Sequence, residues 1–179
     1  MTSIQEAKQT LRQEALAQRA FLDEATFQTL NEALVSRVIE YLNAHRFRRI
    51  GVFYPLSKEV DLRALDHHFE TFYPLIEDGK LTFAPHVGRF VKAPFNTRVP
   101  NTKARLEGSL DAVLVPGLWF DHQGYRLGYG KGYYDGYLKS HQGMKIGVCF
   151  TPFFRLDLPK EDHDQAVDCI ITENQTLCL

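Results

Sequence analysis

The sequence of 179 residues contains no apolar run that approaches the roughly 20 residues needed to cross a bilayer. Its first residues, MTSIQEAKQTLRQEA, are polar and of mixed charge, which is typical of neither a secretory signal nor a membrane anchor. The chain has only three cysteines, and the spacing of Cys149, Cys169 and Cys178 matches no zinc-binding pattern. These absences exclude a disulfide-rich secreted protein and a zinc finger, and we expect a cytoplasmic protein without a membrane partner.

An excess of charge of one sign is also missing. The chain has 21 basic and 22 acidic side chains, so nucleic acid is not an expected partner. Residues 80–139 nevertheless hold nine Lys or Arg against four Asp or Glu, and residues 140–179 hold three against six. A basic middle beside an acidic end suits an anionic ligand accompanied by a metal ion. Length and composition indicate one globular domain over residues 1–179, which we expect to be a monomer.

Hydrophobic periodicity predicts helices first and strands later. Apolar residues recur every three to four positions over residues 4–20, and again after Asp23, which is the expected N-cap of a second helix. Helical spacing returns over residues 61–72, and residues 90–108 show no pattern and are expected to form a loop over the sheet, with a possible substrate contact. Short apolar runs predict buried strands at residues 49–54, 81–84, 112–115, 146–150 and 169–172.

This alternation predicts an α/β protein. We expect a single-domain, three-layer α/β/α architecture with a mostly parallel sheet and an N-terminal helical hairpin packed on it.

The densest chemical signal is the run RLGYGKGYYD at residues 126–135. Its three alternating glycines allow a tight turn that exposes successive backbone N–H groups, which is a favourable cradle for phosphate at the start of a helix. Arg126 and Lys131 add positive charge, and Asp135 could hold magnesium. The run matches neither the Walker A pattern nor the dinucleotide GxGxxG. The alternative interpretation is a glycine-rich turn with aromatic packing and a solvated lysine.

This run, preceded by LVPGLWFD, resembles the signature VPGxxFDxxGxRLGxGxGYYD of the 5-formyltetrahydrofolate cyclo-ligase (methenyltetrahydrofolate synthetase) family. Three other blocks resemble family motifs in the same order. KQTLR at residues 8–12 is similar to KxxLR, and FYPLSKEVD at residues 53–61 is similar to the family's first-strand segment ending in E-[VI]-[DEN]. HDQAVD at residues 163–168, followed by TE at residues 172–173, is similar to the closing HDxxVDxxxTE.

The resemblance implies an enzyme that uses ATP and Mg²⁺ to convert 5-formyltetrahydrofolate to 5,10-methenyltetrahydrofolate through a phosphorylated formyl group, with ADP and phosphate as products. Such chemistry depends on positioning and charge neutralisation more than on a protein nucleophile. The sequence agrees, because it contains no convincing Ser-His-Asp or Cys-His arrangement. One departure is residues 90–108, which are short and lack the family pattern NxxGIxEP. The alternatives are a paralogue that acts on another substrate and a non-catalytic nucleotide- or folate-binding protein.

The family's functional positions map onto this chain residue by residue. The resemblance implies catalytic roles for Lys131, Arg126 and Tyr133, reduced-folate contacts from Tyr54 and Glu59, and magnesium ligation by Asp135 and Asp164. The implied ATP contacts are Lys8, Gln9, Thr10, Leu11, Arg12, Arg126, Leu127, Gly128, Tyr129, Gly130, Lys131, Gly132, Tyr133 and Tyr134.

Each of these positions also has a simpler interpretation. Lys8 and Arg12 share one helix face, which could be solvated instead of binding phosphate. Tyr54 could be a core aromatic residue and Glu59 a surface acid, and Asp164 could be one more acid of an acidic loop. Of the two adjacent tyrosines of the glycine run, one could stack on a ligand while the other packs in the core.

Overall fold

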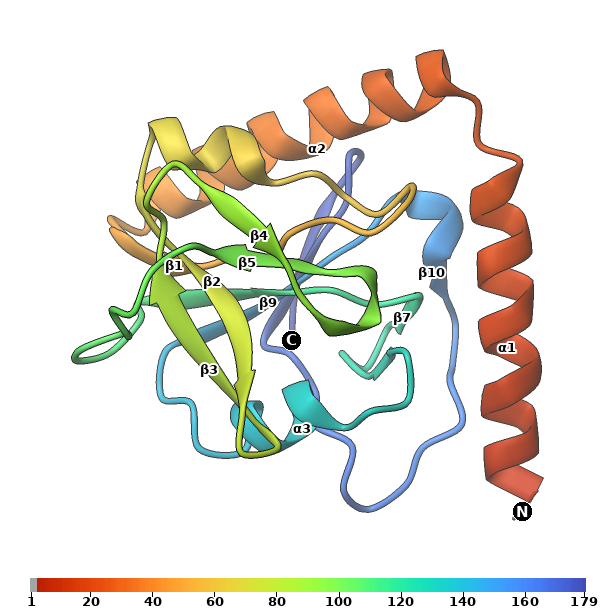
Figure 1. Ribbon diagram of the computed structural model, residues 1–179. Helices are drawn as coiled ribbons and strands as arrows, with labels where there is room; N and C mark the ends of the chain where they lie inside the picture. The colour runs from red at the N-terminus through yellow and green to blue at the C-terminus, as the bar shows by residue number, and fades with distance from the viewer. Residues whose placement is uncertain (1–2) are drawn as a thin grey trace.

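The structure, a computed structural model, describes residues 3–179 and begins with two helices, α1 (Ser3–Ala20) and α2 (Glu24–Ala44). Asp23 caps α2 as predicted, because its carboxylate accepts a hydrogen bond from the backbone N–H of Thr26 at 2.8 Å. In Figure 1, α1 runs along one side of the molecule and α2 runs across the top. The two predicted helices are therefore present, but they do not lie side by side as the helices of a hairpin do.

A seven-stranded sheet forms the centre of the molecule, in the order β12-β11-β9-β6-β1-β2-β3. The inner strands pair in parallel, whereas β3 and β12 at the two edges pair antiparallel. The predicted α/β class with a mostly parallel sheet is thus confirmed. The bounds of the strands are β1 (Arg49–Gly51), β2 (Glu70–Glu77), β3 (Lys80–Pro85), β6 (Ala112–Val115), β9 (Met144–Val148), β11 (Cys169–Ile171) and β12 (Thr176–Cys178).

Smaller elements complete the fold. Three short strands form a separate sheet in the order β10-β7-β8, and β4 pairs with β5 in a hairpin (Figure 1). The bounds of these strands are β4 (Phe90–Lys92), β5 (Arg98–Pro100), β7 (Trp119–Asp121), β8 (Arg126–Leu127) and β10 (Phe154–Arg155). The short helices are the α-helix α3 (Tyr133–Leu138) and the 3-10 helices η1 (Arg63–His67), η2 (Pro94–Asn96) and η3 (Thr151–Phe153).

Different elements cover the two faces of the central sheet. One face is packed against β7, because a Cβ at Gly147 would lie 2.4 Å from the ring of Phe120. The same face carries Phe83, whose ring packs on Tyr137 of α3 at a centroid distance of 5.0 Å. Helix α2, which buries Leu34, Val35, Val38 and Leu42, contacts the sheet at β11 on the opposite face. The third layer therefore consists of one short helix and a small sheet.

Two local predictions were wrong. Residues 61–72 do not form one helix. Only the short 3-10 helix η1 forms there, and the leucines at its N-cap and within it, Leu62 and Leu65, are both buried. The chain then enters β2, where Thr71 and Phe72 pair with β1. Residues 90–108 are not merely a loop, since their first half forms the β4–β5 hairpin. No helix within residues 3–179 has both the length and the apolar character needed to cross a membrane.

The order of the strands predicts where a ligand binds. From β1 the chain continues to β2 on one side, whereas β6 pairs with β1 on the other side. In an open parallel sheet this reversal leaves a crevice at the carboxyl ends of the two neighbouring strands. Four residues that follow β1 and one that follows β6 line a large cavity: Phe53, Tyr54, Leu56, Glu59 and Pro116.

Candidate active site

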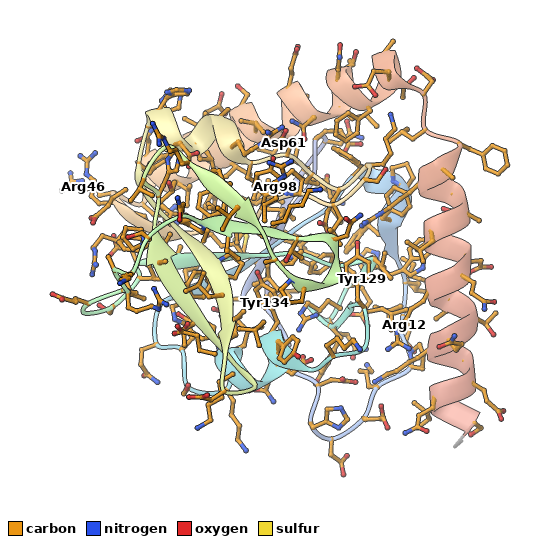
Figure 2. The ribbon with its side chains drawn as sticks, in the orientation of Figure 1. Arg12, Arg46, Asp61, Arg98, Tyr129 and Tyr134 are labelled. Carbon is orange, nitrogen blue, oxygen red and sulfur yellow. The ribbon has the colours of Figure 1, made fainter. Side chains whose placement is uncertain are left out.

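The cavity has a volume of about 1030 Å³, which is large enough for a ligand of drug size or larger. Parts of the chain that are far apart in sequence form its wall: α1, the segment after β1, the β4–β5 hairpin, the glycine run and the acidic loop at residues 161–164. In Figure 2, Arg12 and Tyr129 lie on the side next to α1, Tyr134 lies near α3, and Arg98 lies on the hairpin. The charged residues that line the cavity are Lys8, Arg12, Glu59, Glu77, Arg98, Arg105, Arg126, Lys131, Asp135, Glu161 and Asp164.

The glycine run is shaped to receive a side chain of α1. Gly130 has a positive φ of 86°, and a Cβ at this position would lie 3.2 Å from the guanidinium carbon of Arg12. Arg12 also donates a hydrogen bond from Nε to the carbonyl oxygen of Gly128 at 2.9 Å. These contacts bring a cation of the N-terminal helix against the glycine run, as an anion-binding site requires.

An ion pair joins the first and last residues of the glycine run. The Arg126 side chain is only 5% exposed, and its Nη2 lies 3.0 Å from Oδ1 of Asp135. Burial lowers the pKa of Arg126, and the nearby Asp135 carboxylate opposes that shift. Burial also raises the pKa of Tyr134, whose hydroxyl has no hydrogen-bond partner within residues 3–179. The pair therefore places a fixed positive charge and a carboxylate at one wall of the cavity.

A second set of ion pairs joins α1 to the acidic loop. Lys8 lies with its Nζ 2.6 Å from Asp164 and 2.8 Å from Glu161, and its side chain is 8% exposed. Burial lowers the pKa of Lys8, but the hydrogen bonds that Lys8 donates to the two carboxylates, together with their negative charges, outweigh burial and raise it. The same hydrogen bond from Lys8 lowers the pKa of Glu161. Lys8 is thus held as a cation at the end of the cavity where the acidic loop crosses.

Glu59 is the buried carboxylate on the opposite side of the cavity. One oxygen accepts a hydrogen bond from the backbone N–H of Leu56 at 2.9 Å, and the other accepts one from the Tyr129 hydroxyl at 3.2 Å. Burial raises the pKa of Glu59, while the positive charge of Arg19 opposes the shift. Because Tyr129 belongs to the glycine run, the two halves of the predicted site are joined by a direct hydrogen bond.

Aromatic and cationic side chains surround Tyr54 near the hairpin. The guanidinium carbons of Arg63 and Arg98 lie 5.2 Å and 5.8 Å from the centre of its ring, and Phe90 meets it edge-on at 5.0 Å. Arg98 and Thr97 line the cavity from the hairpin. The short segment that departs from the family pattern therefore forms one wall of the cavity.

Most residues predicted for the site from sequence line this cavity, from Lys8, Gln9 and Arg12 to the whole glycine run through Asp135. Tyr54, Glu59 and Asp164 line it as well. Thr10 and Leu11 do not. The Thr10 hydroxyl bonds the carbonyl of Glu6, and the Leu11 carbonyl accepts the indole N–H of Trp119.

The sequence interpretation did not identify Arg19 and Glu161. Arg19 follows Lys8 and Arg12 at helical spacing on α1, so its position on the same face was a usable signal. Glu161 carried no comparable signal, because its contact with Lys8 joins residues 153 positions apart in the chain.

The acidic residues of the cavity suit a magnesium ion only when phosphate oxygens supply further ligands. No group of three or more His, Cys, Asp or Glu side chains that could hold a metal occurs in the described part of the chain. Asp135 and Asp164 both line the cavity, and both lie close to the charge of Arg126. One or two carboxylates, completed by phosphate oxygens and water, form the common magnesium site of enzymes that use ATP. The donor set therefore suits such an ion.

An α/β fold with a cavity where the strand order reverses and a glycine run beside it is typical of enzymes that bind phosphorylated ligands. A family model described as the 5-formyltetrahydrofolate cyclo-ligase family matches residues 4–173. The chain belongs to this family, which confirms the family predicted from the four sequence blocks.

Individual relatives agree with this assignment. A mouse protein named 5-formyltetrahydrofolate cyclo-ligase is 28% identical over an alignment of 170 positions, which covers 79% of this chain and 81% of its own. A Caenorhabditis elegans protein named as a probable 5-formyltetrahydrofolate cyclo-ligase is 27% identical and covers 99% of this chain and 98% of its own. The solution structure of Aquifex aeolicus 5,10-methenyltetrahydrofolate synthetase has a TM-score of 0.85 and 30% identity, covering 96% of this chain and 92% of that chain.

Proposed function

We propose that this protein converts 5-formyltetrahydrofolate to 5,10-methenyltetrahydrofolate, with the hydrolysis of ATP to ADP and phosphate and with Mg²⁺ bound. The observation that carries the proposal is that one cavity holds both sets of residues expected from the family. The glycine run and α1 form one side of it, and Tyr54 and Glu59 form the other. The Tyr129–Glu59 hydrogen bond joins the two sides.

In the proposed reaction, the formyl oxygen attacks the γ-phosphorus of ATP, and the bond from that phosphorus to the bridging oxygen breaks to release ADP. The second folate nitrogen then attacks the formyl carbon, and phosphate leaves with the former formyl oxygen. The protein contributes position and charge to both steps. Lys8, Arg12, Arg126 and Lys131 supply four cations around the phosphate end, and Tyr133 lies beside them in the wall.

Asp135 and Asp164 would hold the magnesium ion, which neutralises part of the phosphate charge when it is bound. Each carboxylate now pairs with a cation, Asp135 with Arg126 and Asp164 with Lys8. These pairs keep both carboxylates in the cavity wall before ligand arrives. Glu59 would accept hydrogen bonds from the amino and ring N–H groups of the pterin, which form an edge resembling a guanidinium group.

The decisive test mixes the protein with Mg-ATP and 5-formyltetrahydrofolate and follows the absorbance of the methenyl product. Product that requires both ATP and Mg²⁺ is the expected result. The hairpin at residues 90–100 gives a second candidate, a paralogue acting on another substrate, because this wall departs from the family pattern. ATP binding without methenyl product at high enzyme concentration would overturn the proposed reaction and favour the paralogue or a non-catalytic binding protein.

Lys131→Ala is expected to lower kcat/KM for ATP by about 10- to 100-fold, the range for losing one charged hydrogen bond. Lys131 is exposed and lines the cavity, so the melting temperature is expected to stay within about 2 °C of wild type. Steady-state kinetics and thermal unfolding measure the two quantities. Lys139→Ala is the matched control, because Lys139 is also exposed but does not line the cavity. A lower melting temperature with unchanged ATP kinetics would show that Lys131 is structural.

A further inference from the structure

Arg19, on the last turn of α1, belongs to none of the sequence motifs and yet is buried, with only 6% of its surface exposed. Its Nη2 donates a hydrogen bond to the carbonyl oxygen of Gly117 at 2.6 Å, just beyond the end of β6. Its Nη1 donates to the Tyr129 hydroxyl at 3.1 Å and lies 3.8 Å from Oε1 of Glu59. The guanidinium also lies over the ring of Phe153 at 5.2 Å. These contacts fix it in one orientation.

The surroundings of Glu59 make its ion pair with Arg19 important. Glu59 is 4% exposed, and Arg19 is the one cation within ion-pair distance of it among the residues that the structure describes. The other titratable groups facing Glu59 are the hydroxyls of Tyr129 and Tyr134, which carry no charge at neutral pH. A buried carboxylate without a counter-charge becomes protonated, and a protonated carboxyl accepts hydrogen bonds less well.

We propose that Arg19 is a positioning residue that keeps Glu59 ionised and aimed into the cavity for the pterin of the folate. This inference rests on the proposed function. Arg19 acts through Glu59 in two ways, by its charge and by fixing Tyr129, which donates to the same carboxylate oxygen. It also ties the carboxylate to the end of β6, a rigid part of the central sheet.

The test compares Arg19→Met and Arg19→Lys with wild type over a range of pH. Arg19→Met is expected to raise KM for 5-formyltetrahydrofolate about tenfold or more at neutral pH, with KM for ATP within about twofold of wild type. Because Arg19 opposes the raised pKa of Glu59, its loss shifts that pKa further upward. The folate KM of Arg19→Met should therefore recover as pH rises, and Arg19→Lys should restore part of the effect.

A double-variant cycle separates this role from a structural one. In Glu59→Gln there is no carboxylate to titrate, so adding Arg19→Met should not move the pH profile further. A lower melting temperature with equal effects on both KM values, and no shift of the pH profile, would overturn the proposal. The carboxyl carbon of Glu59, followed by NMR during a pH titration, gives a readout without turnover. An unchanged titration in Arg19→Met overturns the role of Arg19, whereas missing methenyl product in wild type overturns the proposed function alone.

A second, independent observation concerns the cysteines of β11 and β12. Cys169 and Cys178 are direct partners in this antiparallel pair, and their Sγ atoms lie 3.0 Å apart. Leu179 donates its N–H to the carbonyl of Asp168 at 3.0 Å in the adjacent pair. Bonded and non-bonded pairs alternate along an antiparallel ladder, so the cysteines occupy a non-hydrogen-bonded position. Cα atoms are about 4.5 Å apart at such positions, within the range that a disulfide spans.

We infer that Cys169 and Cys178 form an oxidisable dithiol that reacts with small-molecule disulfides. Cys178 is exposed and reacts first, because Cys169 is buried and burial raises the pKa of its thiol to about 12. The Cys178 thiolate attacks a small disulfide and releases one thiolate. The Cys169 thiolate then attacks the Cys178 sulfur of the mixed disulfide, releasing the second thiolate and closing the Cys169–Cys178 bond. The two protons lost by the cysteines are taken up by the two released thiolates.

Incubation with oxidised glutathione, followed by mass spectrometry of the unreduced protein, tests this reaction. Wild type is expected to become two hydrogen atoms lighter, with a Cys169–Cys178 linked peptide and a free Cys149. Cys169→Ser is expected to keep a glutathione adduct on Cys178, and Cys178→Ser should remain unmodified because its two thiols are buried. A stable glutathione adduct on wild type without an internal disulfide, or a disulfide-linked dimer, would overturn the inference.

Discussion

Replacing Arg126 by methionine is expected to lower kcat/KM for ATP by about 10³-fold or more and the melting temperature by roughly 10 °C. The side chain is 5% exposed and is the ion-pair partner of Asp135, so its loss leaves a carboxylate that is only 19% exposed without a counter-charge. Breaking such a pair costs about 3–5 kcal/mol of unfolding free energy. The variant also removes a fixed positive charge from the wall where the γ-phosphate is expected.

A double variant separates the two losses. Arg126→Met combined with Asp135→Asn has no unpaired charge, so we expect much of the melting temperature to return while activity stays below that of Asp135→Asn alone. Thermal unfolding and single-turnover kinetics with saturating ATP measure these outcomes. Because Asp135 is itself an expected magnesium ligand, Asp135→Asn alone is the reference, and a double variant as active as this reference would contradict a catalytic role for Arg126 and assign it to folding alone.

The glycine run could be located from sequence because its signal is local. Gly128, Gly130 and Gly132 stand at alternate positions, and the charges that accompany them lie within ten residues. The same holds for α2, whose N-cap Asp23 and apolar stripe are contiguous in the chain. Features of this kind depend on residues a few positions apart, so periodicity and turn chemistry are enough to predict them.

Features that depend on distant pairs could not be predicted in this way. The helix predicted over residues 61–72 overlaps the start of β2, which forms because β1 and β3 offer hydrogen-bonding partners on both sides. The ion pairs of Lys8 connect the first helix to a loop more than 150 residues later. The charge that faces Glu59 comes from Arg19, which lies on α1 but outside the KQTLR motif and every other motif used for the site. Only the fold brings these groups together.

The hydrogen bond between Tyr129 and Glu59 changes how the two halves of the site are understood. Tyr129 was predicted to contact ATP because it lies in the glycine run, yet its hydroxyl reaches the carboxylate expected to bind folate. A ligand that reorders the glycine run therefore also acts on the surroundings of Glu59. The two substrates are expected to meet across this contact, which makes Glu59 the most informative residue on the folate side.

Glu59→Gln is expected to lower kcat/KM for 5-formyltetrahydrofolate by about 10²-fold, the combined effect of weakening two charged hydrogen bonds to the pterin. Glutamine has nearly the same size and can still accept the N–H of Leu56, so ATP binding should change less than about twofold. Steady-state kinetics measures the first quantity, and calorimetric titration with ATP measures the second. Glu107→Gln is the matched control, because Glu107 is exposed and lies outside the cavity. Equal losses for both substrates would contradict a folate-specific role.

Glu59→Gln is also expected to change how the unfolding free energy depends on pH, in a definite direction. Burial raises the pKa of Glu59 in the folded state above 4.5, the ordinary value for glutamate. The folded state therefore binds the proton more tightly than the unfolded state, and its stability falls as pH rises from that ordinary value through the raised one. Glu59→Gln lacks this titration, so the unfolding free energy of wild type relative to the variant should decrease over that pH interval. A difference that stays constant with pH, measured by urea unfolding, would show that Glu59 ionises in the folded protein as easily as in water, and the need for Arg19 beside it would disappear.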